Sequence, residues 1–155
     1  MRRRLTPVLA LFLPALVGAG VLAAHGPGHY DLIVPGEGIG DARLGMSESA
    51  LAAVNVRAGC RVTASFTEDQ AVRLATSVGG ACTTRGGTQV GMHLGSIVAE
   101  FGRPDAIRPD AMYPHAVAVW QEYLAAGIGF RVLIFPDRST LIQAISVFPR
   151  EARRP

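Results

Sequence analysis

A four-residue phrase occurs twice in this chain, 46 residues apart. Residues 44–47 (Leu-Gly-Met-Ser) return as residues 90–93 (Val-Gly-Met-His), and apolar residues at helical spacing follow each copy. Self-similarity at a fixed spacing is the signature of one supersecondary unit that is used twice. Glycine suits a turn, methionine is apolar enough to be buried, and serine caps a helix. The repeat therefore predicts architecture, and it carries no evident chemistry.

Each copy is expected to open a helix. Ser47 can accept hydrogen bonds from the first helical amides and Glu48 complements the positive end of the helix, which predicts a helix over residues 48–55. A complete apolar stripe predicts a second helix over residues 94–101, which ends at a glycine and a proline.

Alternating apolar and polar residues predict strands around these helices. The first is one strand or extended arm over residues 30–34, and a hairpin follows over residues 61–66 and 71–76. A meander of three antiparallel strands is expected over residues 120–124, 128–135 and 140–148. We expect the middle strand of the meander to be buried on both sides, with a helix over at least one of them.

These elements together predict an α+β fold. Residues 25–149 should form a single compact domain of two related modules, about residues 30–85 and 86–149. Each module would be a short helix packed on an antiparallel β hairpin or meander. Residues 150–155 would be a basic, solvated tail.

The N-terminal segment predicts export. Three arginines precede residues 5–24, which carry no charge and end in small residues. Such a segment is either a cleaved signal peptide or an uncleaved N-terminal anchor, and its prolines and glycines favour cleavage. The first cysteine, Cys60, lies too far away to carry a lipid. We therefore expect the protein to be exported and to be periplasmic or extracellular. Contact with a membrane is expected only through an uncleaved N-terminal segment.

The charge pattern excludes several functions. The formal net charge of +3 belongs to the segment over residues 1–24, and the remainder balances twelve arginines against twelve acids. Nucleic acid is therefore not an expected partner. The chain contains no lysine, which rules out Schiff-base enzymes, serine–lysine dyads and the lysine-containing phosphate loop.

The only two cysteines are Cys60 and Cys82. In an oxidising compartment such a pair usually forms a disulfide, which here would join the two ends of the predicted hairpin. Two buried free thiols are the alternative. A zinc site that combined them with His93 and His115 would lack the closely spaced ligand pairs of structural zinc sites.

The repeated phrase, residues 101–105 (Phe-Gly-Arg-Pro-Asp) and the meander over residues 120–147 resemble a class of small exported tandem proteins. This class includes the secreted β-lactamase inhibitor proteins and the single-module outer-membrane assembly lipoproteins. The resemblance implies two helix-on-sheet modules and binding to another protein rather than catalysis. Two features depart from it, since His93 replaces the usual serine or threonine cap and no lipid-bearing cysteine is present.

Recognition is expected on a long connection and a hairpin tip. Residues 102–118 form the longest predicted loop and contain a doubled Arg-Pro-Asp phrase, so they are either a recognition surface or a rigid spacer. The acidic pair on the hairpin tip is either a binding element, as in the inhibitor class, or solvated. The candidate binding residues are Glu68, Asp69, Met112, Tyr113, His115, Trp120 and Tyr123.

No catalytic residue, metal ligand or cofactor emerges from the sequence. Residues 36–40 lack the third glycine of a dinucleotide loop, and no serine lies in a nucleophile elbow. His25 and His29 are weak candidates for copper after cleavage beside His25. We expect a non-enzymatic protein that binds another protein in the envelope or outside it. The alternative is a small secreted hydrolase, or a ligand- or metal-binding protein, on the same scaffold.

Overall fold

The protein is described by a computed structural model that covers residues 31–55, 60–77 and 82–151. It has an α+β fold made mostly of strands, as predicted, with two short helices and two sheets. The predicted signal or anchor, residues 1–24, lies outside the described residues, and so do His25 and His29. Within the described ranges, no helix is long and apolar enough to cross a membrane.

The larger sheet has six strands, and every neighbouring pair is antiparallel. It forms a half-barrel in the order β4-β5-β10-β9-β8-β7. Its strands are β4 (Val62–Thr67), β5 (Gln70–Ser77), β7 (Ala106–Tyr113), β8 (Ala116–Tyr123), β9 (Ile128–Ile134) and β10 (Thr140–Val147). The predicted hairpin and meander are therefore confirmed. The pairing of β5 with β10 joins the hairpin and the meander into one sheet.

The smaller sheet has four short strands in the order β3-β2-β1-β6. They are β1 (Leu32–Val34), β2 (Gly38–Ile39), β3 (Ala42–Arg43) and β6 (Thr83–Thr84). β1 runs parallel to β6 and antiparallel to β2, so a segment just after Cys82 is brought back beside the start of the domain. The predicted first strand is confirmed as β1.

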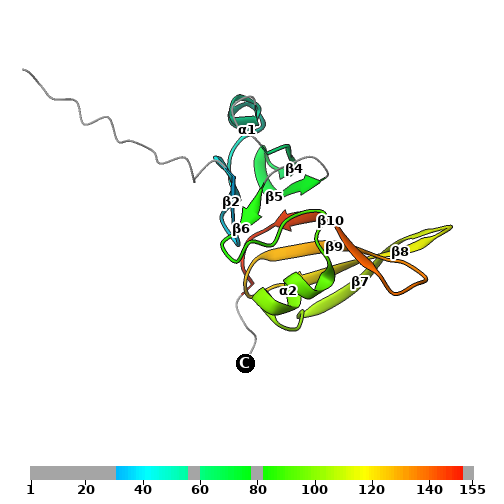
Figure 1. Ribbon diagram of the computed structural model, residues 1–155. Coiled ribbons are helices and arrows are strands. Elements are labelled where there is room, and N and C mark those ends of the chain that lie inside the picture. The colour runs from blue at the N-terminus through cyan, green and yellow to red at the C-terminus, as the bar shows by residue number, and fades with distance from the viewer. Residues whose placement is uncertain (1–30, 56–59, 78–81, 152–155) are drawn as a thin grey trace, which may run out of the picture.

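Both predicted helices are confirmed, as α1 (Glu48–Asn55) and α2 (Leu94–Phe101). Phe101 of α2 packs on one face of the larger sheet, where its ring centroid lies 5.4 Å from that of Tyr123 and 5.3 Å from that of Phe130. Figure 1 shows the β7–β8 and β9–β10 hairpins extending away from both helices.

The middle strand of the meander, β9, is fully buried on only one side. Phe130 and Val132 face α2 and the core and are both 0% exposed. Successive side chains of a strand alternate between faces, so Arg131 and Leu133 point to the opposite face, where both are only half-buried. The expected burial on both sides is therefore wrong for this outer face.

The two copies of the repeated phrase make the same backbone bonds to the sheet. In the first copy, Gly45 N donates to Ala71 O and Ala71 N donates to Met46 O, both at 2.8 Å. The second copy makes the same two bonds, again both of 2.8 Å, to β10 through Gly91, Met92 and Ile142. The first glycine of each copy has a positive φ, 84° and 93°, which glycine adopts without strain.

The first amide of each helix also donates a hydrogen bond to a side chain at or just before the start of the strand that pairs with the repeated phrase. Glu48 N donates to Asp69 Oδ1 at 3.2 Å, and Leu94 N donates to Thr140 Oγ1 at 2.9 Å. Asp69 and Thr140 each lie two residues before the strand residue that pairs with the repeated phrase. Thr140 therefore supplies the cap that His93 lacks, because the His93 side chain makes no capping bond to its own helix.

The predicted long loop over residues 102–118 is wrong. Its greater part forms β7 and the first residues of β8, joined by a two-residue turn at Pro114 and His115. Proline usually argues against a strand because it lacks a backbone N–H. Here β7 is the outer strand of the sheet, and the pairing shifts register between Pro109 and Ala111, so the proline occupies an irregular edge position.

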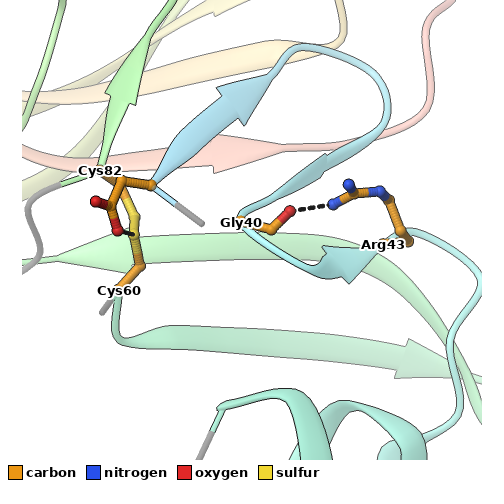
Figure 2. The surroundings of a disulfide bond; sticks show 5 residues. Gly40, Arg43, Cys60 and Cys82 are labelled. Carbon is orange, nitrogen blue, oxygen red and sulfur yellow. Dashed lines mark hydrogen bonds between the residues drawn. A yellow bond between two sulfur atoms is a disulfide. The ribbon is translucent and has the colours of Figure 1, made fainter. Parts of the chain in front are cut away.

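The predicted disulfide between Cys60 and Cys82 is present, with Cα atoms 5.7 Å apart. Figure 2 shows it beside the smaller sheet, where the guanidinium of Arg43 donates to the carbonyl of Gly40. Cys60 and Cys82 are 1% and 0% exposed. The bond therefore ties the segment before β4 to the segment before β6, inside the core.

Replacing both cysteines with serine should lower the free energy of unfolding by about 3 kcal/mol, because the bond closes a chain segment with a sequence separation of 22 residues. Urea unfolding of the wild-type protein and the double variant, with and without dithiothreitol, measures this. The reductant should destabilise only the wild type. A wild-type midpoint that dithiothreitol leaves unchanged would contradict the prediction.

Candidate functional site

The face of the larger sheet that is turned away from α2 carries most of the charged side chains of its strands, together with Tyr113 and Trp120. We call it the arginine face. Strand register places its members opposite one another, as in the pairs Arg108–Trp120, Trp120–Arg131 and Leu133–Leu141. The arginine face comprises Arg73, Arg108, Tyr113, Trp120, Glu122, Arg131, Leu133, Leu141 and Ser146.

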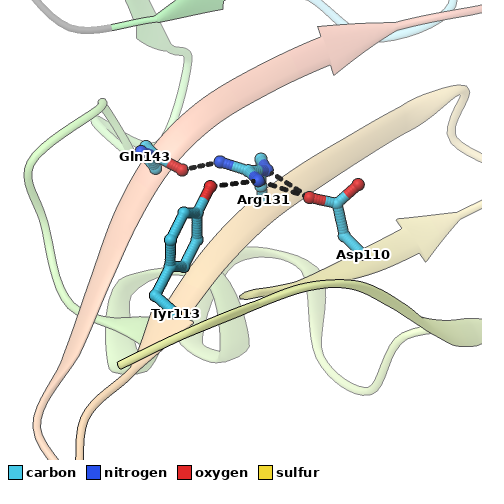
Figure 3. A network of polar contacts seen from close by, with 4 residues as sticks. All are labelled: Asp110, Tyr113, Arg131 and Gln143. Atoms are coloured by element: carbon cyan, nitrogen blue, oxygen red, sulfur yellow. Dashed lines mark hydrogen bonds and ion pairs between the residues drawn. The ribbon is translucent and has the colours of Figure 1, made fainter. Parts of the chain in front are cut away.

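Arg131 joins three strands at the centre of the arginine face (Figure 3). Its Nε donates to Asp110 Oδ2 at 2.7 Å, its Nη2 donates to Tyr113 Oη at 2.9 Å, and its Nη1 donates to Gln143 Oε1. The hydrogen bond to Tyr113, followed by the effects of Asp110, raises the pKa of Arg131 above its ordinary value, although partial burial opposes them. Arg131 therefore stays charged and fixes the side chains around it.

Two aromatic residues, Tyr113 and Trp120, lie on the arginine face near Arg131. Tyr113 is 45% exposed, and its ring centroid lies 5.9 Å from the guanidinium carbon of Arg131. Trp120 is half-buried on β8, directly across from Arg131 on β9. Since Tyr113 is held by a hydrogen bond to Arg131, its ring keeps its position without a partner.

A second charged group lies further along the arginine face, around Glu122. Its side chain is only 4% exposed, and it forms ion pairs with Arg108 Nε at 2.8 Å and Arg73 Nη2 at 3.5 Å. Arg73 also donates to Ser146 Oγ at 3.3 Å and lies 4.7 Å from the ring centroid of Phe148. The buried carboxylate therefore positions two arginines from β5 and β7.

An open pocket of about 440 Å³ lies beside these groups. Its charged lining includes Arg73, Arg108 and Glu122, and its apolar lining includes Val72, Leu124 and Phe148. Arg150 and Glu151 stand at its rim and are exposed. The first residue of the predicted basic tail, Arg150, contacts the domain: its Nη2 donates to Pro35 O at 2.9 Å and lies 3.8 Å from Glu37 Oε1.

Two candidate residues from the sequence, Tyr113 and Trp120, lie on the same face of the sheet, the arginine face. Met112 lies on the opposite face because side chains alternate along β7. It is 88% exposed there, beside Val117 and Ile134 on the next two strands, which are 42% and 37% exposed. The end of the β7–β8 hairpin therefore carries a small exposed apolar patch on the side of α2.

Tyr123 is a core residue and lies outside this surface. It is 4% exposed, its ring packs edge-on against Phe130 with centroids 5.9 Å apart, and its hydroxyl donates to Gly102 O at 3.0 Å. Burial, and then the negative charge of Asp105, raise the pKa of Tyr123. The phenol therefore stays protonated and serves the packing of α2.

His115 and the acidic pair lie at hairpin tips. His115 lines a shallow hollow of about 410 Å³ with residues of the β9–β10 turn, where the hydroxyl and amide of Ser139 lower the pKa of Asp137. Glu68 and Asp69 form the β4–β5 turn, with positive φ values of 50° and 59°. Because Asp69 caps α1, it has a structural task, while Glu68 is exposed.

Sequence reasoning missed the charged members of the arginine face, namely Arg73, Arg108, Glu122 and Arg131. One signal was present: Arg131 interrupts an otherwise apolar strand segment, and Glu122 follows Gln121 in a segment that is apolar before them. A charge in a buried strand needs a partner, so such interruptions indicate an ion pair across the sheet. Among the described residues, no group of three or more His, Cys, Asp or Glu residues could hold a metal ion.

Comparisons of the chain with models of protein families, with curated proteins and with solved structures find no match.

Proposed function

We propose that this chain is an exported, non-enzymatic protein that binds another protein through the arginine face. The observation that carries the proposal is the Arg131 network, which holds Tyr113 on the same exposed sheet surface that carries Trp120. Tryptophan, tyrosine and arginine dominate the energetics of protein interfaces. Side chains that are already fixed lose less conformational entropy on binding, which favours a partner.

The partner should carry acidic groups where it meets this face. Three arginines, Arg73, Arg108 and Arg131, stand against two acids, Asp110 and Glu122, and both acids are already engaged in ion pairs with them. The excess positive charge is complementary to carboxylates on the partner. The apolar side chains Leu133 and Leu141, paired across β9 and β10, supply contact area beside the charges.

The proposal includes a duplicated scaffold with modules of about residues 30–85 and 86–149. The matching backbone bonds of Gly45 to Ala71 and of Gly91 to Ile142 support it. The equivalent caps from Asp69 and Thr140 support it as well. Export is supported by the disulfide, since such bonds persist in oxidising compartments, together with the signal-like sequence of residues 1–24.

The alternative of a small secreted hydrolase has less support. Glu122 is the buried carboxylate of the pocket beside Arg73 and Arg108, and it is ion-paired with both arginines, while the other carboxylate of the lining, Glu151, is exposed. General acid–base catalysis needs a group that is free to exchange a proton near neutral pH. Glu122 serves better as the anchor of the two arginines.

A photo-crosslinking amino acid at position 133 tests the proposal. Leu133 lies on the arginine face, and a reactive group there should join the chain covalently to one partner when export and crosslinking take place in the producing cells. Trp120→Ala should reduce the yield of this product about tenfold or more, as expected for loss of an interface hot spot. Mass spectrometry identifies the product, and circular dichroism checks that the variant is folded.

Val98 provides the matched control, because it is 48% exposed on α2, on the other side of the sheet. The crosslinker at position 98 should not yield the same product. Equal yields from positions 98 and 133, or a product from position 133 that is insensitive to Trp120→Ala, would overturn the arginine face as the binding surface.

A further inference from the structure

We infer that the pocket beside Glu122 binds a carboxylate that is carried on a short, branched apolar group. This inference rests on the proposed function in one respect, namely that the carboxylate belongs to the partner protein. The pocket lies at one end of the arginine face and has a volume of about 440 Å³, enough for one side chain. Three features of its lining lead to this ligand.

The first feature is the orientation of Arg108. Its Nε lies 2.8 Å from Glu122 Oε2 in an ion pair, and its side chain is 64% exposed. Nη1 and Nη2 of Arg108 make no hydrogen bond within the part of the chain that the structure describes. A guanidinium that is paired at its Nε can present these two outer nitrogens as a planar fork, which matches the two oxygens of a carboxylate.

The second feature is the local charge. Glu122 is shared by Arg73 and Arg108, so the three side chains together carry one uncompensated positive charge. With Arg150 and Glu151 at the rim included, the lining has three arginines and two glutamates, and Arg150 also pairs with Glu37 outside the lining. One further negative charge would therefore neutralise the pocket. Because Arg73 is held by Ser146 and stacks on Phe148, it keeps Glu122, and through it Arg108, in place.

The third feature is the apolar wall. Val72, Leu124, Phe148 and Pro149 line the pocket next to the arginines, and Val72 is 38% exposed. Small-molecule sites combine such walls with a few polar groups that fix orientation. A free inorganic anion would leave this wall uncovered. A branched apolar group on the same molecule as the carboxylate would cover it, as in an acidic residue beside leucine or in a C-terminal leucine.

The test is an NMR titration of the purified exported protein with 4-methylpentanoate, observed at the arginine Nε–H groups. The neutral isostere 4-methylpentanamide and inorganic phosphate are the comparison probes. We expect 4-methylpentanoate to shift the Arg108 resonance at a concentration at least about tenfold lower than either comparison probe, since hydrogen bonds to charged groups are the stronger ones.

Two variants and a control complete the titration. Arg108→Gln should weaken 4-methylpentanoate binding by about tenfold or more, and Arg108→Lys should not restore it, because an ammonium lacks the fork. The matched control is Arg103→Gln, at an exposed arginine after α2, which should bind like the wild type. Binding that survives Arg108→Gln, or that the amide or phosphate reproduces, would overturn the inference.

Two peptides distinguish the sources of the carboxylate. Acetyl-Leu-Glu-amide carries it on a side chain, and acetyl-Gln-Leu carries it at the C-terminus. Binding of either supports the inference and identifies the source, whereas binding of neither overturns it. Failure here is separable from failure of the proposed function. If the crosslink from position 133 forms equally in wild type and Arg108→Gln, the face binds a partner without this carboxylate contact.

Discussion

Replacing Phe130 with alanine is expected to lower the free energy of unfolding by about 4 kcal/mol, as for other buried phenylalanines. Phe130 is 0% exposed and contacts the rings of Phe101 and Tyr123, at centroid distances of 5.3 and 5.9 Å. Those rings belong to α2 and β8, so the cavity would open between a helix and the centre of the sheet. Neither neighbour can collapse into it without breaking its own backbone pairing.

Urea unfolding followed by circular dichroism measures the effect. Phe130→Leu keeps most of the volume and should cost roughly half as much or less. Val98→Ala, at a position 48% exposed on α2, should change the free energy of unfolding by less than about 0.5 kcal/mol. A loss below about 1.5 kcal/mol for Phe130→Ala would show that α2 does not pack as described.

The double change Arg73→Ala and Arg108→Ala should also cost about 4 kcal/mol, because it leaves the Glu122 carboxylate buried without a charge partner. The Glu122 side chain is 4% exposed, so water cannot replace the lost arginines at low cost. Each single change should cost less than about 1 kcal/mol, because the arginines are 38% and 64% exposed and the other one remains. The effect is therefore expected to be strongly non-additive.

A third substitution separates this explanation from simple loss of packing. Adding Glu122→Gln removes the stranded charge and should recover most of the stability lost in the double variant. The free energies of unfolding of the two single, the double and the triple variants form the required set. If the double variant loses only the sum of the singles, or if Glu122→Gln recovers nothing, Glu122 is not held by its charge pairing.

Local patterns were enough to predict most of the fold. Both helices and the strands of the hairpin and meander follow from periodicity and capping residues, which act within a few positions of one another. The disulfide followed from having two cysteines in a chain whose first residues resemble an export signal. The sheet order could not be predicted, because the pairing of β5 with β10 joins segments about 70 residues apart and leaves no local pattern.

The candidate site was less predictable, for two physical reasons. Prolines argue against a central strand, so residues 102–118 are predicted as a loop. An outer strand tolerates proline, and only the sheet order shows that β7 is outermost. The sequence places the neighbouring residues Met112 and Tyr113 in one predicted recognition loop, whereas in a strand their side chains lie on opposite faces of the sheet. The partners of Arg131 lie on β7 and β10, so no short-range motif could reveal them.

The irregular outer strand also limits how this molecule can associate. An exposed sheet edge is a template on which another chain can add a strand, which leads to aggregation. Pro109 has no N–H to offer, and the register shift beside it interrupts the row of backbone groups on β7. Copies of the chain are thus discouraged from joining edge to edge through β7, and a partner of the kind proposed would meet the side chains of the sheet instead of the backbone of this strand.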